Sequence, residues 1–109
     1  MTRDEILALK GPEPTAVDCG TYGEVFIRAI SGRERDGFEA AMLGPQPFNN
    51  IRARLLVLAV CDRTGARIFA DDDAELVGNL PAVFLDQLFG VARAVNGLSD
   101  ADVEELKKK

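Results

Sequence analysis

Residues 51–61 read IRARLLVLAVC, and this stretch decides the fold. Every residue after Arg54 in it is apolar, so no face of the segment suits contact with water. Its first half consists largely of good helix formers, and we therefore predict a central buried helix over about residues 50–61. A strand over residues 56–60 is the competing interpretation, because a short apolar run does not by itself distinguish helix from strand.

Helix starts can be predicted on the N-terminal side of this segment. The sequences TRDE (residues 2–5) and SGRE (31–34) have the spacing of capping boxes. The first predicts a short helix over residues 3–9, and the second predicts a helix that stops before the Gly-Pro pair at 44–45. Either asparagine at 49–50 is placed to cap the central helix.

A β-hairpin is predicted between the two capped helices. Polar and apolar residues roughly alternate over residues 22–30, where Val25, Phe26 and Ile27 favour strand. The sequence GTYG (20–23) supplies a turn back to residues 16–19. An isolated hairpin is only marginally stable in water, so we expect one face of it to pack on helices.

After the central helix, turn and capping residues punctuate the chain. The turn DRTG (62–65) has Asp first and Gly fourth. An extended piece is predicted over residues 67–69, and a short helix, capped by Asp72 with Glu75, over about 73–78. A longer helix is predicted over 82–95, between Pro81 at its start and the stop at Asn96-Gly97. A last helix is predicted after Ser99. We therefore predict a single domain over residues 1–109. Its class is α+β: mostly helical, with about five to six helices and one N-terminal β-hairpin.

Charge and residue usage exclude several function classes. The 109-residue chain has a formal net charge of −5, which argues against nucleic-acid binding because that requires a basic face. There is no histidine, and Cys19 and Cys61 are too far apart for a zinc motif. We interpret the two cysteines as packed thiols, with a single disulfide as the alternative.

Location in the cell is predicted from two further features. The first ten residues mix charged and apolar types, unlike a signal peptide. The longest apolar run covers only residues 55–61, which is far too short to span a membrane. We expect a cytoplasmic protein without a membrane partner.

The densest carboxylate group does not have the pattern of a metal or catalytic site. Asp71, Asp72, Asp73 and Glu75 lie together, but Leu76 stands where a calcium loop starting at Asp71 would need glycine. Acidic residues in the first turn of a helix also stabilise its dipole, and we interpret the group in that way. We predict no catalytic residue, no metal, no cofactor and no enzyme activity.

The helix over 82–95 has more apolar surface than one helix face needs. Its polar residues form only a narrow stripe, and the neighbouring central helix is also apolar almost all round. Apolar surface left over on a small protein usually marks a partner site, although a closed monomeric core is the alternative. The predicted partner-binding residues are Val83, Phe84, Leu85, Leu88 and Phe89.

The order of these features resembles that of the tail assembly chaperones of long-tailed (siphovirus-type) bacteriophages and prophages. The resembling pieces are TRDEILALK (2–10), the hairpin followed by AISGRERDGFEA (29–40), NIRARLLVLAVCDRTGARIFADDDAELVGNLP (50–81) and LFGVARAVNGLSDADVEEL (88–106). They cover nearly the whole chain, but they include no invariant catalytic motif.

The resemblance implies a non-enzymatic role in virion assembly. Such a chaperone binds the long helical tape measure protein, keeps it soluble, helps to recruit subunits of the tail tube, and is absent from the finished virion. A frameshifted, longer form carries the contact with the major tail tube protein. The chain ends in three lysines, 107–109, whose codons can form a slippery run of adenines; a solvated helix terminus is the alternative interpretation. Self-association into a homo-oligomer is a further expectation. The alternative is a structural virion protein of the head–tail joining or tail-completion type.

Overall fold

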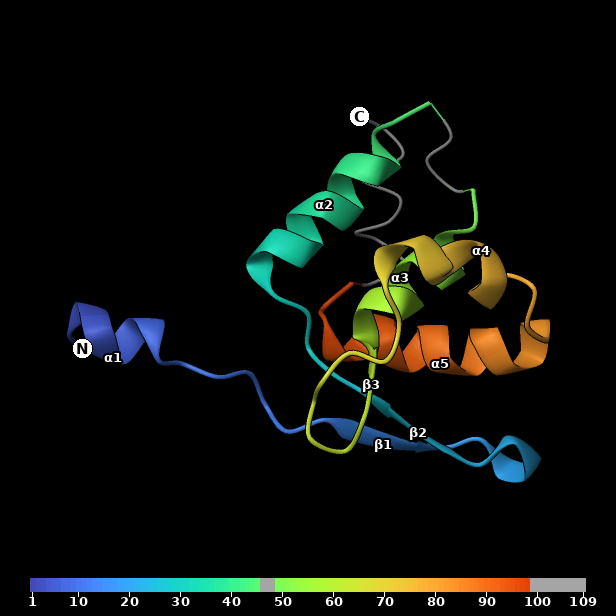
Figure 1. Ribbon diagram of the computed structural model, residues 1–109, viewed down its shortest axis with the longest axis horizontal. Helices are drawn as coiled ribbons and strands as arrows, with labels where there is room; N and C mark the ends of the chain where they lie inside the picture. Colours follow the sequence, from blue (N-terminus) through green and yellow to red (C-terminus); the bar gives the residue numbers. More distant parts are fainter. Residues whose placement is uncertain (46–48, 99–109) are drawn as a thin grey trace.

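The central helix of the fold is α3 (Ile51–Ala59), as the sequence predicts. The computed structural model describes residues 1–45 and 49–98 (Figure 1). Five residues of α3 are buried, and they lie on several sides of the helix because other elements surround it: Ala53, Leu55, Leu56, Val57 and Ala59. The helix packs against α2 (Gly32–Met42), α4 (Ala74–Val77) and α5 (Ala82–Val95).

A three-stranded antiparallel sheet lies beside these helices (Figure 1). Strands β1 (Thr15–Asp18) and β2 (Glu24–Ile27) form the predicted N-terminal hairpin, with Thr15 opposite Ile27 and Asp18 opposite Glu24. A 3₁₀ turn over Gly20–Tyr22 joins them. Both strands contact α5, so one face of the hairpin packs on a helix as expected.

The third strand, β3 (Val60–Cys61), corrects the predicted end of the central helix. We predicted helix to residue 61, but the chain turns to extended backbone at Val60, where ψ is 128°. Val60 and Cys61 then pair with Ile27 and Phe26 of β2. The competing strand interpretation, for residues 56–60, was therefore right only for Val60 and wrong for residues 56–59, which are helical.

Both predicted capping sequences cap a helix, but only the second forms a complete capping box, because the Glu5 carboxylate accepts from the Thr2 hydroxyl and not from its backbone N–H. The Thr2 hydroxyl accepts from the backbone N–H of Glu5 at the start of α1 (Arg3–Leu7). At α2, Ser31 accepts from the N–H of Glu34, and the Glu34 carboxylate accepts from the N–H of Ser31. The chain leaves helix α5 at Asn96, and Gly97 follows with φ of 68°, as in a helix stop.

Two other predicted caps were wrong. Asn50 occupies the N-cap position of α3, but its side chain makes no capping bond and donates to the carbonyl of Ala74 at 2.7 Å. The short helix after Ala70 begins as a 3₁₀ turn over Asp71–Asp73, and Asp73, not Asp72, accepts from the N–H of Ala70. The helix predicted after Ser99 lies outside the described residues.

Hydrogen bonds of Asn96 connect the sheet and α2 to the C-terminal end of α5. Its side-chain oxygen accepts from the N–H of Ile30 at 2.8 Å, and its nitrogen donates to the carbonyl of Ala92 at 2.9 Å. The Arg35 guanidinium donates to the Asn96 carbonyl at 2.6 Å. These bonds hold the strand-to-helix connection against the C-terminal end of α5.

Candidate partner-binding pocket

The structure divides the five predicted partner-binding residues of α5 into three groups. Leu85 and Leu88 are buried, with 5% and 2% of their surface exposed, and Phe84 is half-buried. These three line one pocket. Val83 is 75% exposed and does not line it, whereas Phe89 is half-buried elsewhere, beneath the guanidinium of Arg93 at 5.2 Å. The α5 helix therefore offers a pocket wall and not one continuous binding face.

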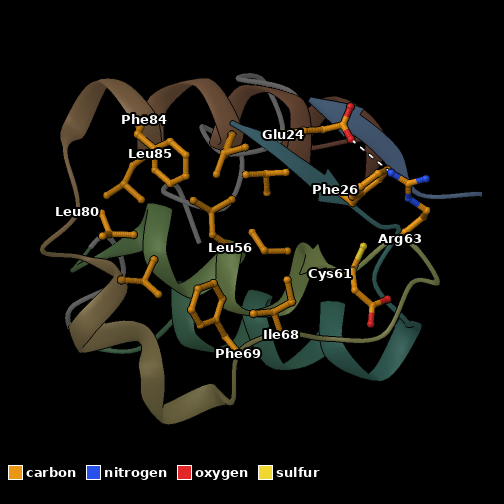
Figure 2. Close-up of a pocket in the computed structure, with 15 residues that line it drawn as sticks. Glu24, Phe26, Leu56, Cys61, Arg63, Ile68, Phe69, Leu80, Phe84 and Leu85 are labelled. Atoms are coloured by element: carbon orange, nitrogen blue, oxygen red, sulfur yellow. Dashed lines mark ion pairs between the residues drawn. The ribbon is translucent and has the colours of Figure 1, made fainter. Parts of the chain in front are cut away.

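The pocket has a volume of about 400 Å³, within the range of small-molecule and side-chain binding sites. It lies between the sheet, α3, the α4 region and α5 (Figure 2). Three of the fifteen lining residues carry a charge. The full lining is Glu24, Val25, Phe26, Leu56, Val60, Cys61, Asp62, Arg63, Ile68, Phe69, Val77, Leu80, Phe84, Leu85 and Leu88.

Exposed apolar side chains form part of the pocket edge. Ile68 and Leu80 are 57% and 41% exposed, and they come from different connections of the chain. Phe84 also packs edge-on against Tyr22 of the hairpin turn, with 5.3 Å between ring centroids. A partner that enters the pocket would therefore bury apolar surface on the rim as well as inside.

The charged residues gather at one end of the pocket (Figure 2). Arg63 lies over the ring of Phe26 at 5.5 Å and pairs with Glu24 at 4.0 Å, and both members of this ion pair are well exposed. Asp62 belongs to the predicted turn: it accepts from the hydroxyl and N–H of Thr64, and these bonds lower the pKa of its carboxyl. The pocket is thus apolar along its length, with a mixed-charge end.

The two cysteines are free thiols, both buried, so the predicted packed thiols are confirmed and the disulfide alternative is wrong. Cys61 lines the pocket, and Cys19 lies between β1 and the 3₁₀ turn of the hairpin. Burial raises the pKa of both thiols; nearby Asp18 raises that of Cys19 further, whereas Arg28 partly opposes the effect at Cys61. A buried thiol of raised pKa is a poor nucleophile, because the thiolate is the reactive form.

A second cavity, of about 530 Å³, lies between α2, α3 and the connection before α4. Its character differs, because five of its eleven lining residues are charged. Arg67 crosses this region: it donates to the Val57 carbonyl at 2.8 Å, pairs with Asp71 at 2.8 Å and approaches Glu34 at 3.6 Å. These contacts connect α2, α3 and the segment before α4. Because they stabilise the fold, we do not consider this cavity the main partner site.

Glu34 is the centre of the same charge network. Burial alone would raise the pKa of its carboxyl, but hydrogen bonds from Arg28 at 2.6 Å and from Ser31 lower it overall. The carboxylate joins the end of β2 to the start of α2. The carboxylate therefore holds these two segments in position.

The acidic group near α4 takes structural roles. Asp71 pairs with Arg67, and Asp73 caps the turn at Ala70. Over residues 1–45 and 49–98, no group of three or more histidine, cysteine, aspartate or glutamate side chains is arranged to hold a metal ion. In the same part of the chain, none of the helices combines the length and the apolar content needed to cross a membrane.

Sequence reasoning missed the part of the pocket that loops supply. Ile68, Phe69 and Leu80 lie outside regular helices and strands, so no periodic pattern marked them. The one feature of the sequence that could have indicated these pocket residues is that they are large apolar residues, isolated beside turn sequences. Such residues are common on protein surfaces, and only their convergence in space distinguishes them.

Comparisons with known proteins give no relative for this chain. Neither the family models, nor the curated proteins, nor the solved structures contain a match. The resemblance to tail assembly chaperones therefore rests on the quoted sequence phrases and the order of elements.

Proposed function

We propose that the protein is a non-enzymatic tail assembly chaperone that binds a long, amphipathic helical client, the tape measure protein, through the apolar pocket. The observation that carries this proposal is the pocket itself, which has few charged lining residues and a rim with exposed Ile68 and Leu80. Such a site suits the apolar face of a helix, which inserts side chains spaced at helical intervals.

The pocket is large enough to bind a short stretch of the client and too small to bind the whole client. A cavity of about 400 Å³ holds a few side chains, so one copy covers a short stretch of a helix. A long client would bind many copies, each with modest affinity. The net charge of −5 supports the same role, because acidic copies along a client would repel other complexes and oppose aggregation.

Recruitment of the major tail tube protein belongs to the same proposal. We assign it to a longer, frameshifted form of the protein. The gene sequence tests this part directly: it should contain a slippery heptamer and an overlapping downstream frame. Without both features, the assignment of tube recruitment to a longer form is wrong.

The central test is co-expression with the tape measure protein encoded by the adjacent long reading frame. We expect the wild-type chain to keep that client in the soluble fraction and to co-purify with it. Leu80→Asp and Ile68→Asp place a charge on the pocket rim, where both side chains are already partly exposed, and should abolish co-purification. Circular dichroism should show that both variants remain folded.

Leu43→Asp is the matched control, since Leu43 is 56% exposed just after the end of α2 and does not line the pocket. It should retain the client. If rim variants and control bind the client equally, the pocket is not the binding site. If the wild-type chain neither co-purifies with the client nor changes its solubility, the chaperone proposal fails. Detection of the chain in purified virions by mass spectrometry would favour the structural virion protein instead.

A further inference from the structure

The N-terminal helix α1 and the residues after it carry large aliphatic side chains that nothing covers in the structure. No residue of α1 is buried; Ile6 and Leu7 are 51% and 67% exposed, and Leu9, which follows the helix, is 66% exposed. Figure 1 shows α1 standing apart from the rest of the molecule, joined to β1 by an extended connection. We call residues 2–10 the arm. A helix of this length is unstable in water by itself, so the arm needs a surface to pack on.

The apolar pocket and the arm have complementary chemistry. The arm carries its three large aliphatic side chains between two basic residues, Arg3 and Lys10. The pocket offers an apolar interior, and its charged end carries Glu24 and Asp62 for a basic residue. Arg63 at the same end suits the acidic first turn of the arm. The ion pair between Arg63 and Glu24 is long, at 4.0 Å, and exposed. Either residue can therefore leave this pair and form an ion pair with a residue of the arm.

The course of the chain favours an arm from another copy. The arm joins β1 at Thr15, which lies opposite Ile27, the last residue of β2. The pocket is lined by Glu24 to Phe26 of β2 and by Val60, which pairs with Ile27. The arm itself points away from the body, and no residue of α1 is buried, so the arm does not occupy the pocket of its own chain (Figure 1).

We propose that the arm of one copy docks its Ile6, Leu7 and Leu9 face in the apolar pocket of a second copy. Because arm and pocket are different surfaces, the contact is head-to-tail, and it builds chains or rings unless two copies exchange arms reciprocally. This inference does not depend on the proposed chaperone role. Where both the arm docking and the chaperone role hold, the client and the arm compete for the same pocket. Binding of the client then dissociates the self-associated copies.

The test uses the full chain without any client. Sedimentation velocity over a concentration series should show a dimer or larger species for the wild type. Leu7→Asp in the arm and Leu80→Asp at the rim should each weaken self-association by at least about tenfold, because each places a charge in an apolar contact. Leu43→Asp, outside both surfaces, should associate like the wild type. A wild-type chain that stays monomeric at every concentration overturns the proposal.

Cross-linking identifies which chain supplies the arm. Chains with Leu7→Cys are mixed with chains with Leu80→Cys and treated with a short bismaleimide; the native thiols are buried and react slowly. We expect a cross-linked heterodimer, and none from Leu7→Cys mixed with Leu43→Cys. A double variant, Leu7→Cys with Leu80→Cys, should cross-link between chains. Cross-links confined to single chains would show that each arm folds onto its own pocket, and would overturn the proposal. Client capture is not measured, so either result leaves the chaperone role to its own test.

Discussion

Three truncations to alanine should separate the core, the pocket wall and the outer surface. Leu55 is fully buried in α3 and does not line the pocket, so its truncation leaves a closed cavity and should cost about 3–5 kcal/mol of unfolding free energy. Leu88 is almost as buried, but it faces the pocket, where neighbours and water can fill the space. We expect about 2–3 kcal/mol for Leu88→Ala, in the lower part of the range for such changes. Val83→Ala should stay within about 0.5 kcal/mol.

Urea denaturation followed by circular dichroism measures these differences. The slope of free energy against urea should be unchanged, so that midpoints report stability. At about 4 °C for each kcal/mol, the melting temperature of Leu88→Ala should fall by about 8–12 °C. The reasoning is refuted if Val83→Ala costs as much as Leu88→Ala, because the burial pattern of α5 would then be wrong. If Leu88→Ala lowers the free energy of unfolding more than Leu55→Ala does, the assignment of Leu88 to an open pocket wall is refuted.

Three further predictions concern charge, close packing and the thiols. Glu34→Gln should cost about 1–3 kcal/mol at neutral pH by leaving Arg28 without its carboxylate. Because the folded-state pKa of Glu34 is lowered, the wild type loses the same stabilisation as pH falls below about 4.3, so urea titrations of the two proteins should converge in acid. Gly78→Ala should destabilise the domain, since a Cβ there would overlap the Asn50 side chain and displace its bond to α4; thermal melts that match the wild type would contradict this. A thiol reagent should label both cysteines slowly in the native state and rapidly after unfolding, and stability should fall above about pH 8.5, where the unfolded thiols ionise first.

Helix positions were predictable because short local signals determine them. The Ser31 and Glu34 side chains bond back to the backbone within one turn, and Gly97 ends α5 through its own left-handed backbone. Neither feature needs a distant partner. The same is true of the turn at residues 62–65, where the Asp62 carboxylate accepts three hydrogen bonds from nearby residues.

Features that depend on distant neighbours were not predictable. Val60 and Cys61 continue an apolar helical run, and only the adjacent β2 makes them a strand. Asn50 has the right residue type for a cap, but the nearby Ala74 carbonyl takes its amide instead. The pocket likewise depends on loops that meet in space. Three of the five predicted partner-binding residues line it because α5 packs with that side toward the sheet, and the sequence alone could not distinguish that side from the one with Val83.

The most direct measurement for the central claim is a map of where the client binds. Amide chemical shifts of the full chain are recorded while a peptide from the apolar heptad-like face of the adjacent tape measure protein is added. We predict shifts centred on Ile68, Leu80 and Phe84, which line the pocket, with little change on α2 around Leu43. Shifts centred on α2, or no shifts at saturating peptide, would contradict the claim that this pocket binds a helical client.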